Sequence, residues 1–139
     1  MSRKNNKMKH YSFESKTESG AFTKICKDME KSLAWESLSL RQRGLYHYIK
    51  SKFTKYSNQD TNQNNLSITT NEAKKLYGDL RTFRYDIDAL INAGFIRQVH
   101  SGYLTKTASI YGLIDLWKGY GTDDFTVPEC YKRYKPPKK

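Results

Sequence analysis

The strongest constraint on the fold is an amphipathic helical pattern that lies between two helix-ending signals. Four apolar residues recur at the three- and four-residue spacing of one helix face: Phe83, Ile87, Leu90 and Ile91. Asp79 has the side chain of an N-cap, and Gly94 is of the residue type that commonly follows a helix. The pattern therefore predicts a helix over residues 80–93 with one face in a core.

A shorter helix is expected directly before this one. Leu66–Ile68 has the alternating pattern of a short strand, and Thr70 is a candidate N-cap for a helix that begins at Ala73. This helix would run to Tyr77 and end at Gly78, since glycine readily adopts the left-handed conformation after a helix. A β-hairpin is expected after the longer helix, with strands at Phe95–Val99 and Ser109–Trp117 and a connection at residues 100–108.

The first half of the chain predicts another amphipathic helix. Ser39 is a candidate N-cap for a helix over residues 40–53. Its expected core positions are Leu45, Tyr48, Ile49 and Phe53. A second stripe of the same helix is basic and consists of Arg43, His47 and Lys50. For this stripe a solvated face is favoured over a binding surface.

The segments around that helix predict smaller elements. Residues 21–26 alternate apolar and polar side chains, which favours a short half-buried strand. Asp28 is a candidate N-cap for a brief helix with three inward positions, Met29, Leu33 and Trp35. Residues 54–65 are too polar to bury, so we expect an exposed loop there.

The chain is strongly basic, with 25 Lys and Arg residues against 14 Asp and Glu residues and a net charge of +11. Residues 1–58 hold 13 of the basic side chains and 5 of the acidic ones. Such an excess indicates an anionic partner, either nucleic acid or an acidic lipid surface. No apolar run approaches the ~20 residues of a membrane-spanning helix, and no signal peptide is recognisable. We therefore expect a cytoplasmic protein with no membrane partner.

No residue pattern indicates catalysis or a metal site. The histidines lack metal-ligand spacing, and Cys26 and Cys130 are too far apart and too few for a zinc cluster or a disulfide framework. Asp86 and Asp88 lie two apart on the expected helix, so their side chains point in different directions. We expect no enzymatic activity, no cofactor and no metal.

The run from Leu76 to Ile96 resembles the helix-turn-helix of winged-helix proteins. It has Leu-x-Gly, a polar turn, Thr followed by an apolar residue, and Leu-x-x-x-Gly-Phe-Ile leading into the wing. Lys31 to Tyr46 is similar to the opening of winged-helix domains in plasmid, phage and integrative-element proteins of Gram-positive hosts. The resemblance covers about residues 21–118. It implies an α+β winged helix-turn-helix fold, with a helical core and a C-terminal β-hairpin wing.

The candidate DNA-binding residues lie on three parts of this motif. The resemblance implies base-recognition contacts from the second helix, at Arg81, Thr82 and Tyr85, and support from the start of the first, at Thr69, Thr70 and Asn71. The residue types add Arg84 on the second helix and Ser101 and Lys106 in the wing, since Arg pairs with guanine and hydroxyls and Lys meet phosphate. Asp86 and Asp88 argue against this assignment, because carboxylates at the groove edge would repel phosphate.

We expect three regions: a flexible basic arm at 1–19, a winged-helix domain at 20–121 and a basic tail at 122–139. The arms would add phosphate contacts or would only keep the chain soluble, and residues 131–135 could stack on single-stranded bases.

The expected function is non-catalytic, sequence-preferring binding of double-stranded DNA in the regulation, replication or transfer of a mobile element, with a homodimer as one arrangement. The alternative is a protein-interaction subunit of a larger replication or primase complex, with the winged-helix domain as adaptor.

Overall fold

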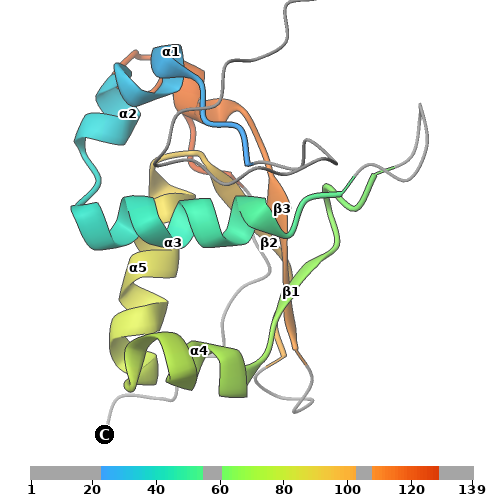
Figure 1. Cartoon of the computed structure of the whole chain (residues 1–139). Coiled ribbons are helices and arrows are strands. Elements are labelled where there is room, and N and C mark those ends of the chain that lie inside the picture. The colour runs from blue at the N-terminus through green and yellow to red at the C-terminus, as the bar shows by residue number, and fades with distance from the viewer. Residues whose placement is uncertain (1–22, 55–60, 103–107, 129–139) are drawn as a thin grey trace, which may run out of the picture.

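The computed structural model describes residues 23–54, 61–102 and 108–128. These residues form a mixed α+β structure of five α-helices, a three-stranded antiparallel sheet and a short 3-10 helix. In chain order they are α1 (Lys27–Glu30), α2 (Leu33–Glu36), α3 (Leu40–Ser51), β1 (Leu66–Ile68), α4 (Thr70–Tyr77), α5 (Leu80–Asn92), β2 (Ile96–His100), β3 (Ser109–Leu113) and η1 (Leu116–Gly119). Figure 1 shows α3 crossing α5, with α1 and α2 at one end of the molecule and α4 at the other.

The sheet has the order β1-β3-β2, so the last strand in sequence is the middle strand in space. Leu66 of β1 lies opposite Tyr111 of β3, and Ile96 of β2 lies opposite Leu113 on the other side. The β2–β3 register is interrupted at Val99, between the pairs of Gln98 and His100. The helix pair α4–α5 is thus inserted between two strands that both pair with β3.

Local capping explains where the three long helices begin. Ser39 and Gln42 form a capping box at α3: the Ser39 hydroxyl accepts from the Gln42 amide at 3.2 Å, and the Gln42 side chain accepts from the Ser39 amide at 2.9 Å. Asp79 caps α5 by accepting from the Arg81 amide at 2.9 Å. These starts confirm the sequence prediction for both helices, and Gly78 ends α4 with φ of 70° as expected.

The start of α4 was predicted incorrectly. Its N-cap is Thr69 and not Thr70, and the helix begins at Thr70 and not at Ala73. The physical reason is a second capping box, in which Thr69 and Glu72 each satisfy the other's backbone amide at 3.1 and 3.3 Å. Helix α4 therefore gains a full turn at its start.

The core is built on the apolar face of α5. Phe83, Ile87, Leu90 and Ile91 are all buried, which confirms the pattern that predicted this helix. An aromatic cluster of Trp35, Tyr46 and Phe95 packs beside them, with ring centroids 5.2–5.7 Å apart.

Three expected core positions on the N-terminal side are not in the core. Leu33 is 61% exposed and Phe53 is 40% exposed, while Tyr48 is half-buried. Tyr46 is buried in their place at 3% exposure. Helix α3 crosses α5 (Figure 1), and the residues of α3 that it buries are Gln42, Leu45, Tyr46 and Ile49, a set that leaves out Tyr48.

Three element predictions also fail. The described residues 23–26 of the expected first strand have no regular structure. The expected helix over Met29–Trp35 is divided into the two short helices α1 and α2. Ser32 caps α2, because its side chain accepts from the Trp35 amide at 3.2 Å. The last strand ends at Leu113, before the 3-10 helix that contains Trp117. The chain has to leave the strand after Leu113, because the Trp117 amide donates to the Gly94 carbonyl at 3.0 Å and the Trp117 ring stacks on Phe95.

Candidate nucleic-acid interface

The exposed face of α5 carries the side chains predicted to read DNA. Arg81 and Arg84 are exposed, and Tyr85 is 67% exposed, although it is a large aromatic residue on a well-packed helix. Thr82 is half-buried, and its hydroxyl donates to the Asp79 carboxylate at 3.0 Å, so it helps to hold the helix start. The core uses the opposite face of α5, which leaves these arginines and the tyrosine on the surface.

Asp86 is not on that surface, which corrects the sequence interpretation. It is fully buried at 0% exposure and accepts four hydrogen bonds. Arg41 donates through Nε at 2.6 Å and Nη2 at 3.0 Å, Tyr77 donates its hydroxyl at 2.8 Å, and Gln42 donates its amide at 3.3 Å. Burial alone would raise the pKa of Asp86, but the hydrogen bonds from these three residues outweigh it and lower the pKa below 3.8.

This carboxylate joins the three long helices. Arg41 and Gln42 come from α3, Tyr77 ends α4, and Asp86 lies in the middle of α5. The cluster therefore fixes how α5 sits against the other two helices. Because Asp86 is buried in this cluster, it is not available to repel phosphate at the surface of α5. Of the two aspartates expected to repel phosphate, only Asp88 is exposed.

The start of α4 is anchored in a similar way. Thr69, Thr70 and Asn71 are all exposed there, with Thr69 engaged in the capping box. The Glu72 carboxylate accepts from the Tyr48 hydroxyl and from Lys52 Nζ, each at 2.6 Å, which ties α4 to the end of α3. Burial raises the pKa of Glu72, but the bonds from Lys52, Tyr48 and Thr69 lower it overall.

Sequence reasoning missed two further cations near this motif. Lys74 and Lys75 are exposed in the last turn of α4, next to the turn that leads into α5. Their position just before Gly78 was a usable signal, because basic residues favour the last turn of a helix and would flank a groove-binding helix. Of the wing residues, Ser101 is half-buried, whereas Lys106 lies outside the described residues, as do the arm at 1–19 and residues 131–135.

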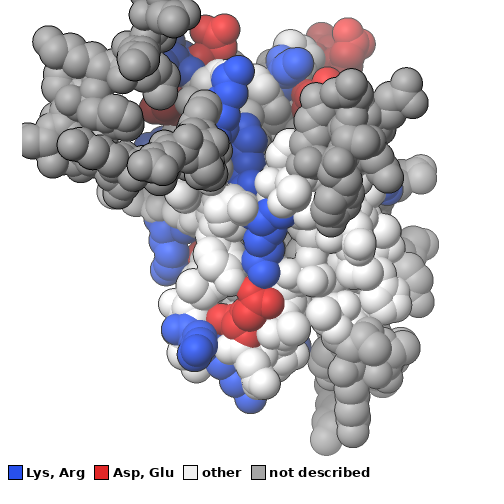
Figure 2. Space-filling view, turned by 45° about the vertical axis from the view of Figure 1, so that its right-hand side comes forward, with Lys and Arg blue, Asp and Glu red and all other residues white. Residues whose placement is uncertain are grey.

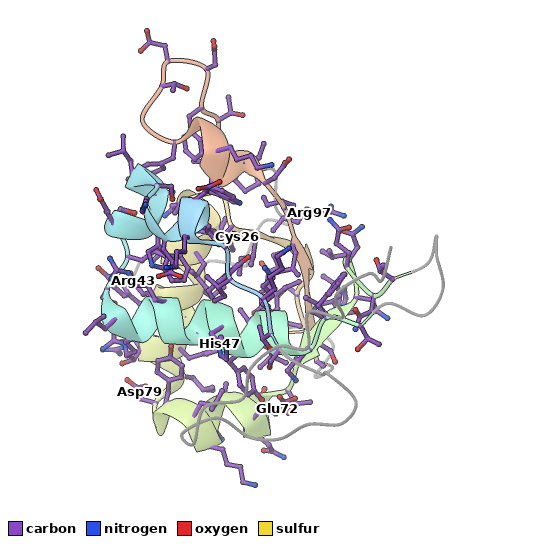
Figure 3. All side chains as sticks on the ribbon, turned by 45° about the horizontal axis from the view of Figure 1, so that its top comes forward. Cys26, Arg43, His47, Glu72, Asp79 and Arg97 are labelled. Carbon is purple, nitrogen blue, oxygen red and sulfur yellow. The ribbon has the colours of Figure 1, made fainter. Side chains whose placement is uncertain are left out.

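Helix α3 carries further basic side chains, among them Arg43 and Lys50. Figure 2 shows Lys and Arg side chains in a stripe that meets Asp and Glu side chains near its lower end. Figure 3 shows Cys26 across α3 from Glu72 and Asp79, with Arg43 and His47 along the helix.

Arg43 supports the fold, because its Nε donates to the Trp35 carbonyl at 3.1 Å and its guanidinium lies 5.8 Å from the Trp35 ring. Lys50 is half-buried, and its pKa is lowered by burial and by the charge of Lys24.

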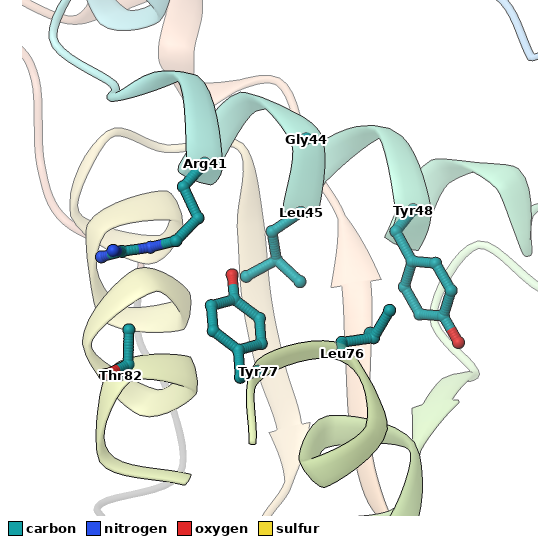
Figure 4. Close-up of a pocket in the computed structure, with 7 residues that line it drawn as sticks. All are labelled: Arg41, Gly44, Leu45, Tyr48, Leu76, Tyr77 and Thr82. Atoms are coloured by element: carbon teal, nitrogen blue, oxygen red, sulfur yellow. The ribbon is translucent and has the colours of Figure 1, made fainter. Parts of the chain in front are cut away.

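A pocket of about 370 Å³ lies between α3, α4 and α5 (Figure 4). Its walls include Arg41 and Gly44 of α3, Leu76 and Tyr77 of α4, and Thr82 in the first turn of α5.

Among the described residues there is no group of three or more His, Cys, Asp or Glu side chains that could hold a metal ion. None of the described helices combines the length and apolar character needed to cross a membrane.

Comparison of the chain with protein-family models, with curated proteins and with solved structures gives no match. A function for this chain therefore has to be inferred from the geometry and chemistry of its own residues.

Proposed function

We propose that the chain is a non-catalytic protein that binds double-stranded DNA through a winged helix-turn-helix formed by α4, α5 and the β2–β3 hairpin. One observation carries the proposal: Arg81, Arg84 and Tyr85 stand exposed on a helix whose other face is locked into the core. The order of elements also supports it, because a brace helix, a glycine turn, a longer helix and a hairpin follow one another as in the resemblance drawn from sequence.

The dimensions and chemistry of α5 suit a major groove. The groove is ~12 Å wide and admits one α-helix, and Arg side chains can pair with guanine through two hydrogen bonds. Tyr85 and the hydroxyls of Thr69 and Thr70 are of the types that contact phosphate. Lys74 and Lys75 would add charge beside the same groove. We propose, from the sequence resemblance, that this binding serves regulation, replication or transfer of a mobile element.

The test is a binding titration against duplexes selected from a random pool, compared with scrambled duplexes at several salt concentrations. Arg81→Ala and Arg84→Ala should each weaken binding to the selected duplex by ~1–3 kcal/mol if the residue reads a base. Lys31→Ala is the matched control, because it removes the same charge from an exposed site between α1 and α2, at the other end of the molecule from α4 (Figure 1). Equal, salt-sensitive binding to every duplex by all variants would reject sequence recognition.

A protein-adaptor function is a second candidate because apolar side chains are exposed near the pocket of Figure 4. Leu76 lines the pocket and is 48% exposed, and the half-buried Tyr48 lines it as well. Exposed apolar clusters of this kind are typical of protein interaction sites. Recovery of one partner from nuclease-treated extract by the wild type but not by Leu76→Asp, with duplex binding unchanged, would favour the adaptor over the DNA-binding proposal.

A further inference from the structure

We propose a second site, which binds a nucleic-acid base together with its phosphate, in the pocket between the end of α3 and the segment that follows β3. The pocket has a volume of about 470 Å³, within the ~300–1,000 Å³ that ligand sites typically occupy. None of its described lining residues belongs to α4 or α5. The site is therefore separate from the duplex-binding surface proposed above and does not depend on it.

A pair of lysines supplies the phosphate-binding group. Lys50 lines the pocket and is half-buried, and Lys24 lies close enough for its charge to lower the pKa of Lys50. The neighbouring Cys26 acts in the opposite direction and raises this pKa. Among the described residues, neither Lys50 nor Lys24 forms an ion pair with a carboxylate. Lys52 differs, because its ammonium is paired with Glu72 at 2.6 Å. A phosphate beside Lys50 and Lys24 would relieve the repulsion between them.

Two aromatic side chains line the same pocket. Phe53 follows α3 and keeps 40% of its surface exposed, so its ring is accessible to a ligand in the pocket. Trp117 is held in place, because its ring stacks on Phe95 with centroids 5.8 Å apart and planes 11° from parallel, and Lys118 Nζ lies 5.8 Å from its ring centroid. Aromatic rings beside basic residues are the usual platform for bases of single-stranded nucleic acid.

The polar groups of the pocket favour a nucleotide over a purely apolar ligand. The Gln63 side chain donates to the Leu113 carbonyl at 2.8 Å, and the Asn64 side chain accepts from Arg97 at 3.0 Å, so both amides are held in place. Asp115, which is exposed and pairs with Lys118 at 3.8 Å, lines the pocket after β3, whereas Lys50 comes from α3. The carboxylate can accept from the exocyclic amino group of cytosine and repels phosphate, which directs the phosphate toward Lys50.

The test uses a ten-nucleotide oligodeoxycytidylate and deoxycytidine monophosphate as probes, with tryptophan fluorescence as the readout. Binding should quench fluorescence in the wild type and not in Trp117→Phe, which keeps the buried Trp35. Quenching by the oligonucleotide alone would identify a single strand as the ligand, and quenching by both would identify a nucleotide in either form. Absence of quenching by both probes up to about 1 mM overturns the proposal.

Variants separate this site from α5. Lys50→Ala should weaken oligonucleotide binding about 5- to 10-fold and reduce the salt slope by ~0.7, as for one lost phosphate contact. Phe53→Leu should weaken binding at least about fivefold through lost stacking. Arg81→Ala, which removes one charge from α5, should bind the oligonucleotide within about twofold of wild type. Wild-type affinity in both pocket variants, with folding verified by circular dichroism, would reject the site even if duplex binding through α5 holds.

Discussion

Replacement of Asp86 by alanine should cause a large loss of stability, because Asp86 joins α3, α4 and α5. The substitution leaves Gln42, which is 7% exposed, and the half-buried Tyr77 hydroxyl without their charged acceptor. Removal of one member of a buried ion pair costs ~3–5 kcal/mol. The Arg41 side chain is 54% exposed and can be rehydrated, so the lower end of this range applies. We therefore expect the free energy of unfolding to fall by about 3 kcal/mol.

The assay is urea unfolding followed by helical circular dichroism. With a slope of ~1–3 kcal/mol per molar urea, a loss of this size lowers the unfolding midpoint by about 1–3 M. Asp88→Ala is the matched control, since it removes the same side chain from an exposed position on the same helix and should cost at most about 1 kcal/mol. Equal losses in the two variants would refute the conclusion that Asp86 holds the helices together.

Three further predictions concern stability. Folding lowers the pKa of Asp86, so its contribution to the free energy of unfolding is complete above pH ~4 and is lost as pH falls through the folded-state pKa. The urea midpoint of Asp86→Asn should therefore decline less steeply below pH ~4 than that of the wild type. Parallel curves for the two proteins would contradict this. Gly94→Ala should cost about 3 kcal/mol or more, since φ is 86° and the added Cβ would lie 2.6 Å from the Trp117 amide. Gly44→Ala, in the middle of α3 with no atom within 4 Å of the added Cβ, should instead raise stability by ~0.5–1 kcal/mol. Thermal unfolding of the two glycine variants checks the opposite signs, and a shift in the same direction for both would be inconsistent with the structure.

Helix α5 could be predicted from sequence because everything that defines it lies within one segment. The N-cap Asp79, the spacing of the four apolar residues and Gly94 can all be recognised within residues 79–94. The exposure of Arg81, Arg84 and Tyr85 followed from the same periodicity. Thr69 could also be predicted as the N-cap of α4, because Thr69 and Glu72 form a capping-box pattern in the sequence. The prediction of Thr70 as the N-cap overlooked that pattern.

The parts that sequence did not predict depend on distant partners. Asp86 lies beside the apolar face of α5, and its burial is possible only because Arg41 approaches from α3, 45 residues away in sequence. Trp117 has the residue type of a strand, but its position over Phe95 requires the chain to turn after Leu113. The effect of Lys24 on the pKa of Lys50 likewise joins two residues that are distant in sequence, one before α1 and one in α3.

The place of β3 between β1 and β2 determines the order in which this chain can fold during synthesis. Helices α4 and α5 contact each other through neighbouring sequence and can pair as soon as both have been made. Neither β1 nor β2 has a neighbour in the described sheet until β3 emerges, since β3 pairs with both. A chain interrupted before Ser109 would therefore present two unpaired strand edges beside a formed helix pair. Early termination would yield an aggregation-prone fragment, not a smaller working domain.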